Sequence, residues 1–129
     1  LFPFPIYNMN YVSNEKELVD IYNAVDLYVT PSLQDNLPNT IVEAMACGIP
    51  CVGFNVGGIP QMIDHLHNGY VARYKSAEDL ANGIRWALTE GDYETLSAEA
   101  NRKALNTYSE TTVAQQYIKI YNQITGSNA

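Results

Sequence analysis

Apolar residues follow two different patterns along the chain. Short continuous apolar runs bounded by Pro, Gly, Asn or Ser predict buried strands, and apolar residues three or four apart predict amphipathic helices. The predicted strands comprise residues 5–9, 26–30, 50–54 and 70–73. The predicted helices comprise residues 14–24, 39–47, 60–65, 76–90, 93–107 and 111–125. Continuous apolar strands alternating with helices indicate a parallel sheet covered by helices, with the helical C-terminal third on one side of it.

Capping residues support the ends of these predicted helices. Asn14 followed by Glu17 forms a capping-box-like start for the first helix. Pro38 suits a first helical turn because its missing N–H would have no partner there. Gly48 suits the left-handed position that follows a helix end, so a helix is expected from about Asn39 to the residue before it.

Composition indicates a globular domain and argues against several ligand classes. The chain has 129 residues, 47% of them apolar, which is enough for one domain with a core. Its 7 basic and 14 acidic residues give a net charge of −7. Such a surface repels phosphate backbones and anionic lipids, so we expect no nucleic acid and, for this domain alone, no membrane surface as partner. No run approaches the roughly 20 apolar residues of a membrane span, and no secretory signal pattern opens the chain.

The cysteines and histidines do not have the spacing of a metal site. Cys47 and Cys51 are separated by three residues, which fits neither a redox Cys-x-x-Cys motif nor a zinc ribbon. We expect buried free thiols in a reducing compartment, which indicates a cytoplasmic protein. His65 and His67 are expected on the surface beside a loop, and no metal is expected.

Two loops at the carboxyl edge of the predicted sheet contain residues that suit a nucleotide. Ligands of parallel α/β sheets bind at the carboxyl ends of strands, where loops lead into helices. The loop after the second predicted strand leads into a helix whose first N–H groups, from Asn39 and Thr40, favour a phosphate. The Thr40 hydroxyl could add one more bond. The loop after the third predicted strand contains the pair Gly57-Gly58.

Glu43 lies about one helical turn beyond Asn39 and has apolar neighbours on both sides. A charge in such surroundings is costly without partners. The two hydroxyls of a ribose could donate to it, and hydrogen bonds to a charged group contribute about 1.5–3 kcal/mol. The alternative is that Glu43 points to solvent or bonds a nearby backbone N–H. Asp35 alone fits a cap or loop residue, and a glycine pair alone fits a turn, so the prediction depends on all of them in one order.

This order of residues resembles a known family. Asp35 is followed after seven residues by Glu43, and the segment continues with Ala44-Met45-Ala46, Gly48, Pro50 and Gly57-Gly58. Residues 27–32 (LYVTPS) and 68–71 (NGYV) match the family as well. The pattern resembles the C-terminal, donor-nucleotide-binding domain of retaining GT-B glycosyltransferases, in the glycogen-synthase and sucrose-synthase-like superfamily of group 1 glycosyl transferases. The resemblance covers residues 11–100 and implies an α/β fold with a Rossmann-like parallel sheet and flanking helices.

The resemblance also implies roles for particular residues. Glu43 would hold the ribose hydroxyls of the donor nucleotide and Asp35 would lie near the donor sugar; these are the two predicted catalytic residues. Val12 would lie near the nucleobase. The other predicted donor-binding residues are Asn36, Leu37, Pro38, Asn39, Thr40, Gly57 and Gly58. The family usually needs no metal, because helix N-termini and basic side chains stabilise the leaving diphosphate. No cofactor is implied, since the nucleotide-diphosphate sugar is a substrate.

The implied activity is that of a retaining, metal-independent glycosyltransferase, which transfers a hexose to a glycan or lipid-linked acceptor in polysaccharide biosynthesis. The family's basic Arg/Lys pair has no counterpart before Val12, and its N-terminal acceptor domain is missing. Residues 1–129 are therefore expected to be the C-terminal part of one donor-binding domain, inactive alone. Residues 108–125 are expected to form a helix that packs on the missing domain. Only the full-length enzyme would meet the acceptor or a membrane surface.

Two departures and two alternatives accompany the resemblance. Asp35 stands where the family usually has Glu, and residues 36–38 replace its usual Gly-Phe-Gly, so the loop should hold the donor sugar differently.

A sugar-nucleotide epimerase of similar shape would need acid/base residues that are not found here. A non-catalytic α/β interaction module predicts that Glu43 is exposed or bonded to backbone. A donor site predicts instead that Glu43 faces the same cleft as the Asn39 helix start and the glycine pair.

Overall fold

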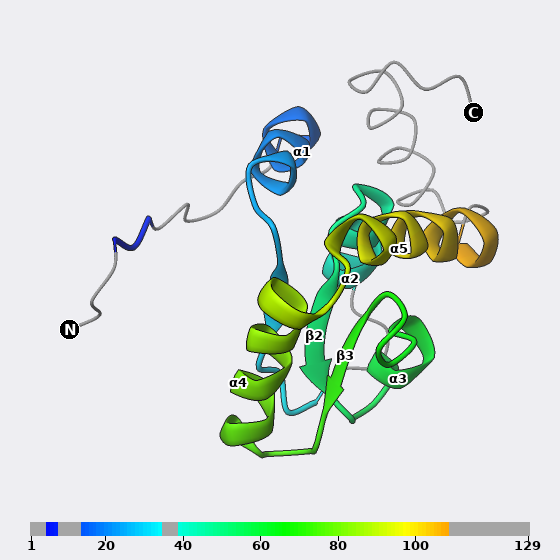
Figure 1. Cartoon of the computed structure of the whole chain (residues 1–129). Helices are drawn as coiled ribbons and strands as arrows, with labels where there is room; N and C mark the ends of the chain where they lie inside the picture. The colour runs from blue at the N-terminus through cyan, green and yellow to red at the C-terminus, as the bar shows by residue number, and fades with distance from the viewer. Residues whose placement is uncertain (1–4, 8–13, 35–38, 109–129) are drawn as a thin grey trace.

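A computed structural model describes residues 5–7, 14–34 and 39–108 of the chain. Within these residues, three strands form one parallel sheet in the order β1–β2–β3 (Figure 1). The strands are β1 (Tyr28–Thr30), β2 (Cys51–Phe54) and β3 (Gly69–Ala72). The sheet confirms the predicted α/β class and three of the predicted strands, each with its ends within two residues of the prediction.

The strand predicted over residues 5–9 is wrong where the structure describes it. Pro5, Ile6 and Tyr7 are exposed and belong to no strand, and residues 8–13 lie outside the described part of the chain. Pro5 has no N–H to donate to a neighbouring strand, so an apolar run that contains it is less suited to form a strand within a sheet.

The helices also follow the predictions closely. They are α1 (Glu15–Asn23), α2 (Asn39–Ala46), α3 (Ile59–Met62), α4 (Ala77–Arg85) and α5 (Tyr93–Tyr108), with a π-helical segment (Trp86–Glu90) directly after α4. The helix predicted over residues 60–65 is shorter than expected, because the backbone is already extended at Ile63. The helix predicted over residues 111–125 lies outside the described residues.

Local side chains explain where the helices begin and end. The Asn14 carboxamide oxygen accepts from the Lys16 and Glu17 N–H groups, at 2.8 and 3.3 Å, and so caps α1. Ser76 caps α4 in the same way, accepting from the Asp79 N–H at 3.1 Å. Gly48 has a φ of 73°, which is the left-handed conformation expected just after the end of α2. The capping signals at Asn14, Ser76 and Gly48 are therefore confirmed, whereas Pro38 lies outside the described residues.

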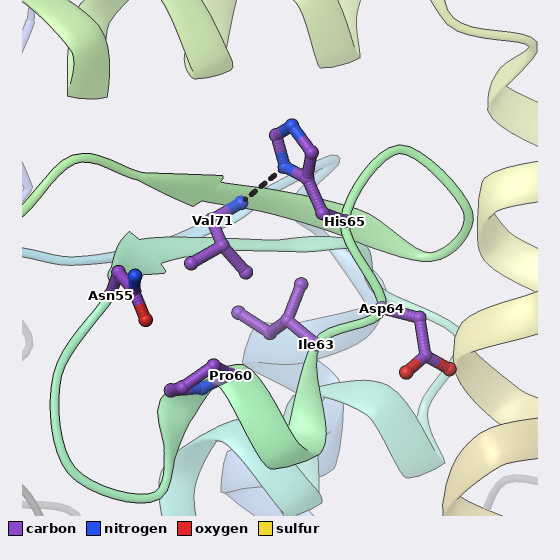
Figure 2. A pocket seen from close by; sticks show the side chains of 6 residues that line it. All are labelled: Asn55, Pro60, Ile63, Asp64, His65 and Val71. Atoms are coloured by element: carbon purple, nitrogen blue, oxygen red, sulfur yellow. Dashed lines mark hydrogen bonds between the residues drawn. The ribbon is translucent and has the colours of Figure 1, made fainter.

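The helices lie on both faces of the sheet. Helix α4 packs against β3 and β2 on one face, and α2 and α3 pack against β2 from the other (Figures 1 and 2). All residues of β2 are buried, as expected for a central parallel strand. The prediction that the whole C-terminal third covers one side of the sheet is wrong for α5, which packs mainly on α2.

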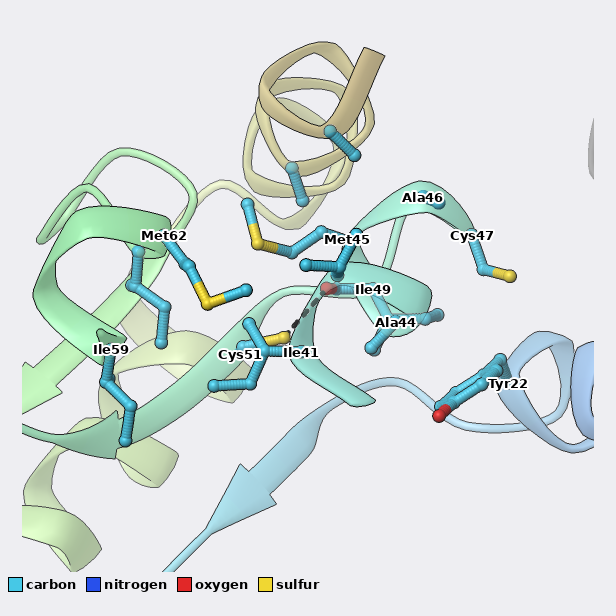
Figure 3. Close-up of a cluster of buried hydrophobic side chains, with 14 of the residues drawn as sticks. Tyr22, Ile41, Ala44, Met45, Ala46, Cys47, Ile49, Cys51, Ile59 and Met62 are labelled. Atoms are coloured by element: carbon cyan, nitrogen blue, oxygen red, sulfur yellow. Dashed lines mark hydrogen bonds between the residues drawn. The ribbon is translucent and has the colours of Figure 1, made fainter. Parts of the chain in front are cut away.

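The main core lies between α2, α3, β2 and α5 (Figure 3). Its largest fully buried side chains include Ile41 and Met45 of α2 and Ile59 and Met62 of α3. Burying one such side chain contributes about 1.5–3 kcal/mol, so this cluster is the main source of stability for the sheet face that it covers.

Small and polar residues of α5 allow close packing on α2. Ala100 and Ala104 lie one turn apart on α5 and are fully buried. Beside them, the Ser97 hydroxyl donates to the Gly48 carbonyl at 2.6 Å and the Asn101 amide donates to the Ala46 carbonyl at 2.9 Å. The final carbonyls of a helix have no partner within it, so α5 both covers α2 and satisfies its C-terminal end.

Gly69 permits the pairing of β3 with β2. A Cβ atom built at Gly69 would lie 2.1 Å from the Cys51 carbonyl oxygen, far inside van der Waals contact. Just before it, Asn68 is buried, and its side-chain oxygen accepts from the Asp64 N–H at 2.9 Å. Within the Asn-Gly pair, close backbone approach therefore requires Gly69, while Asn68 holds the turn that precedes β3.

Candidate functional site

The carboxyl ends of β1 and β2 lie at the same edge of the sheet, because the two strands are parallel neighbours. From this edge one connection leads into α2 and the other leads into α3. Asn39 and Thr40 are exposed at the start of α2, and Glu43 is half-buried one turn later. The structure thus confirms that both predicted ligand-binding loops follow the ends of adjacent parallel strands.

Half of the predicted site residues lie outside the residues that the structure describes. These are Val12, Asp35, Asn36, Leu37 and Pro38. Their predicted roles toward the nucleobase, the sugar and the diphosphate therefore stay predictions.

Glu43 is held by a side chain from another helix. The Tyr22 hydroxyl of α1 donates to Glu43 Oε2 at 2.9 Å. Glu43 is half-buried, and the other residues of α2 from Ile41 to Ala46 are buried. The carboxylate therefore lies at the border of the core, and it accepts a hydrogen bond from a side chain of another helix.

A second tyrosine holds the first turn of α2. The Tyr28 hydroxyl of β1 donates to Thr40 Oγ1 at 2.9 Å. The Tyr22 and Tyr28 rings also contact each other edge to face, with centroids 6.5 Å apart and an interplanar angle of 66°. Tyr22 lies within the helix predicted over residues 14–24 and was not singled out from the sequence. A tyrosine, rather than a leucine or phenylalanine, at a buried position was the signal that its hydroxyl has a partner.

The second loop contains the predicted glycine pair. Gly57 has a φ of 57°, a conformation that favours glycine, and Gly58 is buried at the start of α3. Next to this loop, a hollow of about 490 Å³ lies between α3 and β3, lined by Asn55, Pro60, Ile63, Asp64, His65 and Val71 (Figure 2). The glycine pair therefore forms a tight turn, as predicted.

His65 lies at this hollow, and its ring is fixed by two contacts. Its Nδ1 accepts from the Val71 N–H at 3.0 Å, and the ring contacts Tyr70 at a centroid distance of 4.6 Å. Because Nδ1 is an acceptor here, a neutral imidazole carries its proton on Nε2. His65 and His67 are both exposed, as expected.

The two cysteines are free and buried, which confirms their predicted state. Burial raises the pKa of Cys47 to about 12, and the nearby Glu43 carboxylate adds to this effect. Burial likewise raises the pKa of Cys51, whose thiol donates to the Ile49 carbonyl (Figure 3). Both thiols therefore stay protonated near neutral pH, and neither is suited to act as a nucleophile.

The described residues offer neither a metal cluster nor a membrane span. Across residues 5–7, 14–34 and 39–108, no three His, Cys, Asp or Glu side chains gather where they could hold a metal ion. In the same part of the chain, no helix combines the length and the apolar character that crossing a bilayer requires.

Comparison with known proteins connects this geometry to a family. The sequence profile described as Glycosyl transferases group 1 matches residues 8–106. The chain is 29% identical over 117 residues to N,N'-diacetylbacillosaminyl-diphospho-undecaprenol alpha-1,3-N-acetylgalactosaminyltransferase of Campylobacter jejuni, a match that covers 90% of this chain and 31% of that protein. It is 36% identical over 90 residues to D-inositol 3-phosphate glycosyltransferase of Rhodococcus jostii, covering 69% of this chain and 20% of that protein.

Solved structures show the same fold. Sucrose-phosphate synthase from Thermosynechococcus elongatus superposes with a TM-score of 0.70 at 25% identity, covering 88% of this chain and 29% of that one. Anabaena HepE in complex with UDP-glucose superposes with a TM-score of 0.65 at 27% identity, covering 80% of this chain and 29% of that one. The chain thus spans less than a third of the length of these relatives. Because the family profile covers most of its residues and the sheet and helices match solved members, the chain belongs to the group 1 glycosyl transferases.

Proposed function

We propose that this chain forms the donor-nucleotide-binding part of a nucleotide-sugar-dependent glycosyltransferase. The observation that carries the proposal is Glu43, a half-buried carboxylate one turn beyond the start of the helix that follows the carboxyl end of β1, held by Tyr22. Family membership supports a transferase over the epimerase and over the non-catalytic interaction module.

Glu43 would recognise the ribose of the donor. A carboxylate accepts up to about four hydrogen bonds, so the bond from Tyr22 does not exhaust its acceptor capacity. A vicinal diol offers two O–H donors at the spacing of the two carboxylate oxygens. Hydrogen bonds to a charged group contribute about 1.5–3 kcal/mol each where water is excluded, which is enough to select a ribonucleotide.

The start of α2 would hold the diphosphate. The first N–H groups of a helix have no partner within it and carry the positive end of the helix dipole. Asn39 and Thr40 are exposed there, and Thr40 adds a hydroxyl. We propose that the donor contacts extend to Asn36, Leu37, Pro38, Gly57 and Gly58, with Val12 near the base and Asp35 near the sugar.

We also propose the type of reaction, the acceptor, the donor and the location of the enzyme. Transfer of a hexose with retention and without a metal would fit stabilisation of the leaving diphosphate by helix N–H groups. A glycan or lipid-linked acceptor is supported by the undecaprenol-linked substrate in the name of one relative. A UDP-sugar donor is supported by HepE, whose structure holds UDP-glucose. We propose a cytoplasmic enzyme in which residues 1–129 contribute part of the donor domain and residues 108–125 contact the acceptor domain.

Nucleotide binding is the test that the chain itself permits, because it spans less than a third of its relatives. UDP, GDP and ADP are titrated into isotopically labelled protein, and amide shifts are followed. We expect shifts at Asn39–Glu43 and at the Gly57-Gly58 turn with at least one nucleotide.

Two variants serve as the matched pair for this titration. Glu43→Gln keeps the shape of the side chain but should lose these shifts. Glu78→Gln changes an exposed carboxylate in the first turn of α4 and should keep them. Wild-type protein without shifts at α2 for any nucleotide, or equal binding by Glu43→Gln, would contradict the proposal.

A further inference from the structure

Two tyrosines from outside α2 hold two of its polar side chains, those of Thr40 and Glu43. Tyr22 of α1 donates to Glu43 Oε2 and Tyr28 of β1 donates to Thr40 Oγ1, both at 2.9 Å. Thr40 and Glu43 lie three residues apart on α2 and so project from neighbouring turns of one helix face. Two independent contacts thus converge on the residues that the proposed donor site uses.

The two tyrosine rings form one aromatic unit. Tyr22 is only 7% exposed and Tyr28 is half-buried against the core. Their edge-to-face contact, with centroids 6.5 Å apart, is the preferred geometry for an aromatic pair. Val19, three residues before Tyr22 on α1, is fully buried and anchors the same helix face. The unit is therefore rigid, and each hydroxyl is presented from a fixed ring.

Rigid donors suit the orientation of polar side chains at a ligand site. Glutamate has three side-chain torsions, and one short hydrogen bond from a fixed hydroxyl removes much of that freedom before a ligand arrives. The carboxylate still has acceptor capacity beyond that bond. Thr40 accepts from Tyr28, so its own O–H remains a donor that can be directed at an anion.

We infer that Tyr22 and Tyr28 are positioning residues, Tyr22 aiming the Glu43 carboxylate at the ribose diol and Tyr28 aiming the Thr40 hydroxyl at the diphosphate. This inference rests on the proposed function and adds a division of labour to it. Neither tyrosine touches the nucleotide; each acts through its partner on α2. Their effects on binding should therefore depend on different parts of the ligand.

The first test compares UDP with 2′,3′-dideoxy-UDP, using the full 129-residue chain. Tyr22→Phe keeps the ring and removes the hydroxyl. It should weaken UDP binding about fivefold, as expected for one hydrogen bond, and should leave the affinity for dideoxy-UDP unchanged. If Tyr22 had only a structural role, the substitution would weaken the binding of both ligands equally, and that result would overturn its assignment as a positioning residue. If GDP or ADP is the nucleotide that binds, its dideoxy analogue takes the same place.

The second test compares UDP with uridine. Tyr28→Phe should weaken the binding of UDP and leave the amide shifts induced by uridine unchanged, because uridine has a ribose but no phosphate. Equal weakening of UDP and uridine would overturn the assignment of Tyr28. Tyr70→Phe is the matched control, since it also removes a tyrosine–carboxylate hydrogen bond, the 2.8 Å contact with Asp79, and it should change the binding of none of these ligands.

The wild-type protein separates failure of the inference from failure of the proposed function. Wild-type binding that prefers UDP over its dideoxy analogue, and that Glu43→Gln weakens about tenfold, supports the proposed function. With that result in hand, unchanged affinity in Tyr22→Phe would overturn the inference alone. Wild-type protein that binds UDP and dideoxy-UDP equally would instead contradict the role of Glu43 itself.

Discussion

The same chemical pair, a tyrosine hydroxyl donating to a carboxylate, occurs in two regions of the molecule with different surroundings. In one region Tyr22 donates to Glu43 at 2.9 Å, and in the other Tyr70 donates to Asp79 at 2.8 Å. The Tyr70–Asp79 pair joins β3 to α4, elements that follow each other in the chain. The Tyr22–Glu43 pair joins helices α1 and α2, and its two residues are 21 positions apart in the chain.

Asp79 has all the marks of a structural carboxylate. The Arg73 N–H donates to its Oδ2 at 2.7 Å, and its own backbone N–H donates to Ser76 Oγ. The Arg73 backbone bond and the Tyr70 bond hold the pKa of Asp79 below its ordinary value. These contacts, all from within ten residues of chain, make Asp79 the first-turn residue that fixes α4 to the end of β3.

Glu43 differs in where its described hydrogen bond comes from. It lies inside α2 rather than at its cap, and its tyrosine reaches it from a separate helix. A carboxylate bound by a backbone N–H group of a neighbouring segment supports the local fold. The origin of the partners, and not the pair itself, therefore separates the structural role of Asp79 from the ligand role that we propose for Glu43.

The largest expected effect is on stability in the Asp79 region. Asp79→Ala leaves the Tyr70 hydroxyl and the Arg73 N–H without their acceptor, so the free energy of unfolding should fall by about 2–3 kcal/mol. Urea unfolding measures the change. Glu78→Ala, an exposed neighbour in the same turn, is the control and should change stability by less than about 0.5 kcal/mol. Equal losses of stability in the two variants would contradict a structural role for Asp79.

The next effect is on binding in the Glu43 region. Glu43→Gln should weaken nucleotide binding about tenfold, because a neutral amide is a weaker acceptor for the ribose hydroxyls. Its stability should stay within about 1 kcal/mol of the wild type, since the amide oxygen can still accept from Tyr22. Titration and urea unfolding are measured on the same preparation. If the variant lost stability but kept its nucleotide affinity, Glu43 would be a structural carboxylate like Asp79, which would contradict the proposed ligand role.

A third variant disturbs the Tyr70–Asp79 pair without changing either partner. A Cβ atom at Gly83 would lie 2.4 Å from Tyr70 Cδ1, so alanine there must displace the ring. Although alanine favours helices, Gly83→Ala should lower stability by about 1–2 kcal/mol. In a Tyr70→Ala background the clash is gone and the same change should stabilise the protein. Thermal unfolding of the four proteins tests this, and a stabilising effect in the wild-type background would contradict it.

The smallest effect is a pH dependence. A carboxylate whose pKa is lowered in the folded state contributes stability above the ordinary aspartate pKa of about 3.9 and loses it as the pH falls through the folded value. The stability difference between wild type and Asp79→Asn should therefore be constant near pH 6–7 and shrink below about pH 4. Unfolding curves across this range measure it; a difference that grows on acidification would show that the bonds to Asp79 do not favour its charged form.

The sequence alone was sufficient for most of the fold of residues 14–34 and 39–108. The starts of α1 and α4, at Asn14 and Ser76, and the end of α2 at Gly48 were readable because capping depends on residues only two or three positions apart. The buried strands were readable from their continuous apolar runs. The π-helical segment after Arg85 had no such local signal, and the strand expected over residues 5–9 is not formed at residues 5–7, the part of it that the structure describes.

For the site, the sequence determined which residues to consider, and the tertiary structure decided how they are held. Glu43 and Thr40 could be named from their positions at the start of a helix after a strand. That their partners are Tyr22 and Tyr28 depends on how α1 and β1 pack against α2, and the Ser97 and Asn101 contacts with α2 span 49 and 55 residues. Backbone preferences act over a few neighbouring residues, whereas side-chain hydrogen bonds between elements exist only after packing has set the distances between them.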